Sequence, residues 1–115
     1  MPAKHTITSI KALPGKELAK GVTIKPLAGD HVMLNYVEFV ANGEVPLHSH
    51  HHEQLGLILE GELAMQIGEE RRVLRPGDTY VIPGGLQHSG RAGAAGALVL
   101  DVFYPLRDDY LKLFA

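Results

Sequence analysis

The chain has 115 residues, of which 45% are hydrophobic and 21% charged, a composition that suits one ordinary folded domain over residues 1–115. Its formal net charge of −2 reflects 11 basic and 13 acidic residues, so it lacks the basic surface that nucleic acids and anionic membranes require. The absence of cysteine excludes disulfides and thiolate chemistry, which leaves nitrogen and oxygen as the metal-binding atoms. We therefore expect neither nucleic acid nor a membrane as a partner.

The N-terminal segment, MPAKHTITSIKALPGKELAKG, is interrupted by charges and prolines, so it lacks the apolar core of a signal peptide. No apolar run elsewhere approaches the length that crosses a membrane. These features predict a cytoplasmic protein.

From residue 22 onward, short segments rich in Val, Ile, Leu and Tyr alternate with Gly, Pro and Asp turns. This rhythm is typical of an all-β sandwich or barrel. The predicted strands cover residues 32–39, 54–60, 62–67, 79–82 and 97–104. We expect the small-residue stretch RAGAAGA, before the last strand, to form a loop. The side chains interpreted as core include Met33, Met65, Leu55, Leu57 and Leu59.

The C-terminal segment is the one part with a helical pattern. After Pro105, the apolar residues Leu106, Tyr110 and Leu113 fall at helical spacing. Two aspartates stand early in this segment, where carboxylates favour a helix N-terminus. The pattern predicts a short C-terminal helix that covers one end of the barrel.

The stretch HSHHHEQ, residues 48–54, combines four histidines with a glutamate and a glutamine. In extended backbone alternate side chains share a face, so the even-numbered residues point one way and the odd-numbered residues the other. The even-numbered set consists of His48, His50, His52 and Gln54. If this face looks into a barrel, binding a cation would offset the cost of burying unpaired imidazoles. The alternative interpretation is an exposed loop without a role.

Two spaced motifs resemble those of the cupin superfamily. The first is GEVPLHSH, three residues, Gln54, six residues and Gly61; the second is Gly77, five residues, PGG, two residues and His88. The resemblance implies a small antiparallel jelly-roll β-barrel that holds a metal inside its mouth. The chain departs from the pattern at Gln54, where the first motif usually has Glu, and at Ala92, where the second often has Asn.

The resemblance also implies a metal site of His48, His50, Gln54 and His88, with His52 and Glu53 as alternatives to Gln54. A neutral glutamine leaves the full charge on the cation, which should make it a stronger Lewis acid. These donors suit one divalent transition metal such as Zn, Ni, Fe, Co or Mn, and they also suit copper.

The last predicted strand, ALVLDVFY, places Asp101 and Phe103 on one face. A buried carboxylate is either paired or functional, and the structural alternative is a salt bridge from Asp101 to Arg107 or Arg91. The sequence alone is compatible with both interpretations.

A narrower resemblance concerns small cupin enzymes of pectin and alginate breakdown, which ketonise 4,5-unsaturated monouronates. It is carried by the segments GVTIKPLAGD, HSHHHEQ, PGDTYVIPGGLQHS and DVFYPLRDDYL. It implies an isomerase with a small-molecule substrate and with Asp101, Phe103 and Arg107 as catalytic residues. Asp101 would carry protons, Arg107 would bind the substrate carboxylate through paired hydrogen bonds, and Phe103 would form an apolar wall.

Several alternatives share the same barrel. One is a cupin oxygenase with a redox-active metal, and another is a sugar- or metal-binding cupin without catalysis. A third is a structural barrel whose histidine cluster is empty. Similar cupins often pair through their N-terminal strands, so the resemblance further implies a homodimer.

Overall fold

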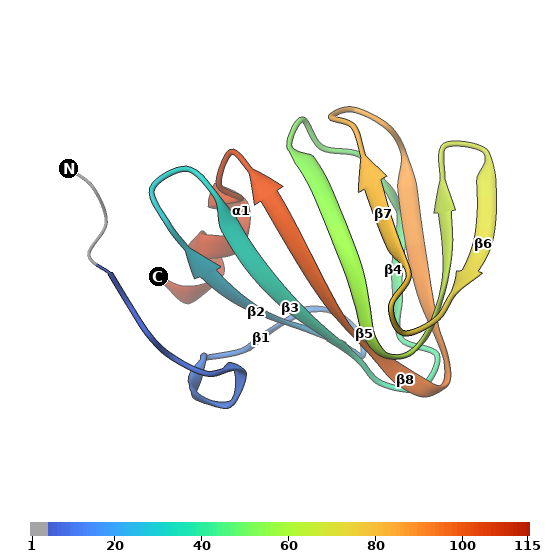
Figure 1. The fold of residues 1–115 in the computed structure, drawn as a ribbon, viewed down its shortest axis with the longest axis horizontal. Helices are drawn as coiled ribbons and strands as arrows, with labels where there is room; N and C mark the ends of the chain where they lie inside the picture. Colours follow the sequence, from blue (N-terminus) through green and yellow to red (C-terminus); the bar gives the residue numbers. More distant parts are fainter. Residues whose placement is uncertain (1–4) are drawn as a thin grey trace.

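The structure is a computed structural model that describes residues 5–115, which fold into eight strands and three short helical turns (Figure 1). In chain order the elements are η1 (Ile10–Ala12), β1 (Lys16–Ala19), β2 (Val22–Ala28), β3 (Met33–Phe39), β4 (Glu44–His48), β5 (Glu53–Ile67), β6 (Glu70–Leu74), β7 (Thr79–Ile82), β8 (His88–Tyr104), α1 (Asp108–Leu111) and η2 (Lys112–Phe114).

The strands pair antiparallel in the order β1-β2-β3-β8-β5-β6, with β4 added to β8 and β7 added to β5. The two long strands, β5 and β8, pair with each other along most of their length. In one half of this pair, β8 also pairs with β3 and β5 also pairs with β7. In the other half, β8 pairs with β4 and β5 pairs with β6. Because both long strands bend, they belong to both layers of the barrel (Figure 1). The predicted antiparallel jelly-roll barrel with a short C-terminal helix is confirmed.

The predicted strand boundaries differ from the structure in two places. Segments 54–60 and 62–67 form one continuous strand, β5, in which the pairing with β8 shifts register on either side of Gly61. The stretch RAGAAGA is not a loop, because it lies inside β8 and pairs with β5 at Ala92 and Ala97. Small residues have low strand propensity, and here the pairing with a long neighbouring strand overrides it. Strands β1, β2, β4 and β6 were not among the predicted strands.

The barrel core is formed by alternate side chains that point inward. Met33 and Met65 are buried as predicted, together with Ile24, Ile58 and Val99. The interpretation of the β5 leucines as core is wrong. Leu55 is 45% exposed, and Leu57 and Leu59 are half-buried. Since side chains alternate along a strand, the inward positions belong to Gln54, Gly56 and Ile58.

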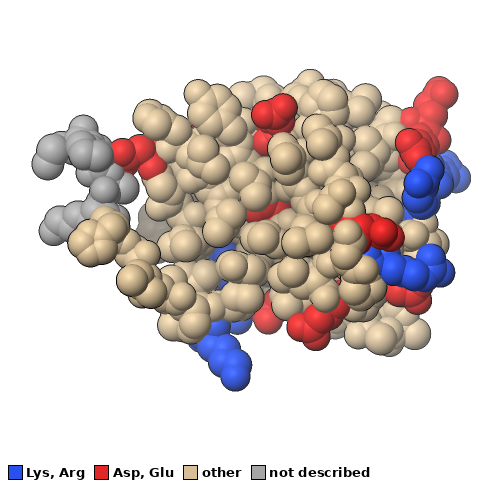
Figure 2. Space-filling view, viewed as in Figure 1, with Lys and Arg blue, Asp and Glu red and all other residues tan. Residues whose placement is uncertain are grey.

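The outer face of this sheet is therefore apolar. One cross-strand row joins Leu34, Val102, Leu55 and Val81 from four adjacent strands. A second row pairs Tyr36 with Leu100 and Leu100 with Leu57. The view in Figure 2 shows mostly uncharged side chains across the molecule, with Lys and Arg gathered toward its edges.

The C-terminal turn covers the barrel end that lies next to Phe103. The Tyr110 side chain is buried, and its ring packs edge-on against Phe103 with the centroids 5.8 Å apart. Leu113, by contrast, is partly exposed. Within residues 5–115, no helix combines the length and the hydropathy that crossing a membrane would need.

Candidate metal centre and active site

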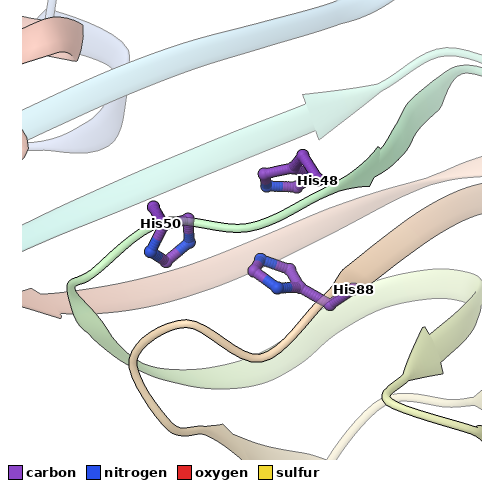
Figure 3. Close-up of side chains that lie close together, drawn as sticks. All are labelled: His48, His50 and His88. Carbon is purple, nitrogen blue, oxygen red and sulfur yellow. The ribbon is translucent and has the colours of Figure 1, made fainter.

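Three histidines from two distant parts of the chain converge inside the barrel (Figure 3). His48 ends β4, His88 begins β8, and the register of these two strands pairs the two residues directly. His50 follows in the connection to β5. One nitrogen from each ring lies within 4.8 Å of the others. The three histidines are thus positioned to bind a metal.

The glycines of the PGG motif bring the loop before His88 against the histidine segment. A Cβ on Gly84 would lie 2.2 Å from the carbonyl oxygen of His51, which no other residue could accommodate without displacement. The backbone N–H of Gly85 donates to the carbonyl oxygen of His50 at 2.7 Å. The two histidine motifs are therefore joined by their backbones as well as by their imidazoles.

Contacts with backbone carbonyl groups determine which ring nitrogen of His48 and of His88 is free to bind a metal. His48 Nδ1 lies 2.8 Å from the carbonyl oxygen of Pro46, and His88 Nδ1 lies 2.9 Å from that of Leu86. A carbonyl oxygen only accepts, so both Nδ1 atoms carry the proton and both Nε2 atoms keep a free lone pair. The Nε2 atom of His88 is buried without a hydrogen-bond partner. Such a nitrogen is costly to bury, and a bound cation would satisfy it.

Gln54 completes the same cluster. Its side chain is buried, and its Oε1 accepts a hydrogen bond from Nε2 of His50 at 3.0 Å, which leaves Nδ1 of His50 buried without a partner. The alternatives are placed differently: Glu53 is exposed, and His52 is buried outside the group of three histidines.

Burial favours the neutral form of His50, His52 and His88. Burial, reinforced by the nearby charge of Arg107, lowers the pKa of His50 from 6.5 to about 4. Burial also lowers the pKa of His88 and that of His52. At neutral pH the lone pairs are thus available without loss of a proton.

A row of polar side chains crosses the inner face of the sheet beside this cluster. The register places Asn35 opposite Asp101, Asp101 opposite Gly56, and Gly56 opposite Tyr80. The Tyr80 hydroxyl donates a hydrogen bond to Oδ1 of Asp101. This contact requires glycine at position 56, because a Cβ there would lie 2.0 Å from the Tyr80 ring.

Asp101 is buried at the centre of this polar row. Burial raises its pKa from 3.8 to about 6, against the opposing effect of hydrogen bonds from Tyr80 and Gln54 and of the charge on Arg107. The expected structural alternative is not found, since the ion pairs among the described residues include none from Asp101 to Arg107 or Arg91. Tyr80 takes the partner role instead.

Arg107 is buried above Phe103 and Tyr110, with its guanidinium carbon 3.8 Å from the Tyr110 ring centre. Its Nε and Nη2 donate to the two carboxylate oxygens of Asp109 at 3.0 and 2.7 Å. Its Nη1 is buried without a partner. Two of the three guanidinium nitrogens are thus already engaged, and one remains to meet a ligand.

His48, Gln54 and His88 of the metal cluster line one cavity of about 50 Å³ together with the polar row. Its polar walls are formed by Asn35, His48, Gln54, Tyr80, His88 and Asp101. Phe103 and Tyr110 contribute apolar surface. A ligand in this cavity would meet both the metal-binding nitrogens and the buried carboxylate.

Three residues of this site were not predicted from the sequence. Tyr80 and Asn35 face inward by strand alternation, and this signal could have been read, since Tyr80 shares its parity with Ile82. The role of Asp109 as the partner of Arg107 depends on the C-terminal turn and had no comparable signal.

Comparison with known proteins defines the class of protein. A family model described as a cupin domain matches residues 35–103, which is more than half of the chain. The chain therefore belongs to the cupin family, as its two histidine motifs predicted.

Individual relatives match over nearly the full chain. The pectin degradation protein KdgF of Dickeya dadantii (strain 3937) is 29% identical over 100 residues, which cover 85% of this chain and 91% of that protein. The structure of KdgF from a Halomonas species is 28% identical with a TM-score of 0.86, covering 93% of this chain and 99% of that one. An RmlC-like cupin from Shewanella frigidimarina, at 23% identity, also has a TM-score of 0.86, covering 95% and 97% of the two chains.

The arrangement of the cluster predicts which histidines retain a metal. We expect His88→Ala to weaken metal binding by more than about 100-fold, because even partners outside the ligand set contribute 10- to 100-fold. His51→Ala is the matched control, since His51 lies in the same segment but is exposed. Elemental analysis after dialysis would measure both. Equal retention by the two variants would contradict the assignment.

The lowered pKa of His50 predicts a pH dependence of the metal-free protein. Between pH 6.5 and about 4 the unfolded chain binds more protons at His50 than the folded protein does, so the free energy of unfolding should fall as the pH is lowered through this window. The raised pKa of Asp101 acts in the opposite direction. We expect His50→Gln to flatten the fall, as measured by urea denaturation across this range. A steeper fall in the variant would be inconsistent with a neutral, buried His50.

Proposed function

We propose that this chain is a metal-dependent isomerase that acts on a small carboxylated sugar such as a 4,5-unsaturated monouronate. The observation that carries the proposal is the shared cavity, in which a cluster of metal-binding groups faces a buried carboxylate with a pKa of about 6. The similarity to the pectin degradation protein KdgF supports a substrate of the uronate class.

We assign His48, His50, Gln54 and His88 as the ligands of one divalent transition metal ion. When bound, such an ion would polarise a substrate oxygen and stabilise negative charge that develops on it. The donor set suits Zn, Ni, Fe, Co or Mn. All four ligands are neutral, so none of the positive charge would be cancelled by the protein.

Asp101 is the proposed proton carrier. Conversion of an enol to its ketone moves one proton from oxygen to carbon and involves no oxidation or reduction. A carboxyl group with a pKa near the working pH can give a proton to carbon and accept one in return. Tyr80 holds the carboxyl group in one orientation through its hydrogen bond.

Phe103 and Arg107 are proposed to place the substrate. Phe103 is buried in the cavity wall and offers an apolar surface to the sugar ring. Arg107 offers the N–H groups of Nη1, while Asp109 holds the rest of the guanidinium. The expected paired contact with a substrate carboxylate is therefore revised to a contact through one nitrogen.

Replacing the carboxyl group tests the proton-transfer role. Asp101→Asn keeps the size of the side chain, so we expect metal content to stay unchanged while turnover of unsaturated uronates falls by about 10²- to 10⁴-fold. Loss of the conjugated chromophore, followed by absorbance without O₂, is the measurement. Undiminished turnover would rule out the role of Asp101, and turnover that requires O₂ would favour an oxygenase.

We further propose that the chain forms a homodimer through the apolar outer face of β3, β5, β7 and β8. Monomeric proteins rarely expose contiguous apolar patches of this kind, and the rows through Leu55 and Leu57 span these strands without a charged residue. Strands β1 and β2 continue the same sheet from β3. A second copy would cover this face.

The dimer is tested with a charge placed in the middle of the patch. We expect the wild-type chain to elute as a dimer and Leu55→Glu as a monomer in size exclusion with light scattering. Val73→Glu is the matched control, because Val73 is equally exposed, at 45%, but lies on β6. A monomeric wild type, or a dimeric Leu55→Glu variant, would contradict the proposal.

A further inference from the structure

Asn35 is the member of the inner polar row without an assigned role. It lies on β3 directly opposite Asp101, and the residue is 1% exposed. Its neighbours at the inward positions of β3, Met33 and Val37, are both apolar and buried. A polar side chain among such neighbours needs a partner or a function.

The amide oxygen of Asn35 has no hydrogen-bond partner. Leaving a buried acceptor unpaired costs free energy, and native proteins rarely tolerate it without a reason. Among residues 5–115, the other buried unpaired atoms are nitrogens of His50, His52, His88 and Arg107. Asn35 Oδ1 is thus the one acceptor in this set, and Asn35 lies opposite Asp101.

The positions around Asp101 show what Asn35 can reach. Tyr80 approaches the carboxyl group from β7 across Gly56, and its hydroxyl is already engaged there. Asn35 flanks the same carboxyl group from β3, and its side chain lines the cavity. A ligand group that donates a hydrogen bond to Asn35 would therefore lie beside Asp101.

We propose that Asn35 is a substrate-binding residue whose amide oxygen accepts a hydrogen bond from a hydroxyl group of the sugar. The inference rests on the proposed function and deepens it, because it places a hydroxyl-bearing carbon next to the proton carrier. A site built in this way selects hydroxylated substrates, since an analogue without the hydroxyl leaves the buried oxygen unpaired.

The competing explanation is a single buried water that satisfies Asn35 and has no part in binding. The cavity of about 50 Å³ has room for such a molecule, since about 10–15 Å³ of such space is enough for one water. The two explanations differ in what the loss of Asn35 does to ligand affinity.

The test compares Asn35→Leu and Asn35→Ala with the wild-type, metal-loaded protein. The measurements are KM for a 4,5-unsaturated monouronate, affinity for a saturated, unreactive hexuronate by calorimetry, and stability by urea denaturation. We expect both variants to keep their metal and to raise KM and the uronate Kd by roughly three- to tenfold, the value of one neutral hydrogen bond. Asn35→Leu should be no less stable than the wild type, because it removes an unpaired buried group.

Met33→Ala is the matched control, since Met33 is the neighbouring inward residue on β3 and is equally buried, but it is not among the residues that line the cavity. It should lower stability and leave the uronate Kd unchanged. Unchanged KM and Kd in both Asn35 variants would overturn the role of Asn35 while leaving the proposed function intact. A wild type that neither converts nor binds uronates would instead overturn the proposed function, and the hydroxyl assignment with it.

Discussion

The site depends on the antiparallel pairing of β4 with β8, which sets His48 directly opposite His88. These residues are 40 positions apart in sequence (88 − 48), so only the folded barrel can bring their rings together. The Pro83-Gly84-Gly85 loop adds a second constraint, since its backbone contacts the backbone of the histidine segment. The backbone pairing and the loop contacts therefore bring the imidazoles together.

The two long strands supply the rest of the chemistry at alternate positions. On β5, Gln54 faces the histidines and Gly56, two residues later, leaves room for Tyr80. On β8, Asp101 and Phe103 have the same spacing. Because inward side chains recur every second residue, Gln54 and Asp101 fall in neighbouring rows across the sheet. Under the proposed function, this arrangement would place a Lewis acid and a proton carrier in one buried space.

The sequence predicted the fold class, the strand at 79–82 and the inward set of histidines, because these depend on local periodicity and on spaced motifs. It mispredicted Leu55, Leu57 and Leu59 because a run of apolar residues hides which parity faces the core. The polar residue Gln54, which the sequence placed on the inward face, was the one signal that the even-numbered residues of this strand face the core. The partners of Asp101 and Arg107 could not be predicted, since Tyr80 and Asp109 are fixed by cross-strand register and by the C-terminal turn. Contacts of this kind exist only after the chain has folded.

The central claim is that one cation is bound jointly by side chains of the two histidine motifs, around positions 48–54 and 88. A crystal structure of the metal-loaded protein, with the ion located by anomalous scattering, tests it most directly. The account predicts one ion inside the barrel, ligated by Nε2 of His48 and His88, by a ring nitrogen of His50 and by Oε1 of Gln54. An ion bound instead at the surface by His51, or a barrel interior without an ion at full metal loading, would contradict it.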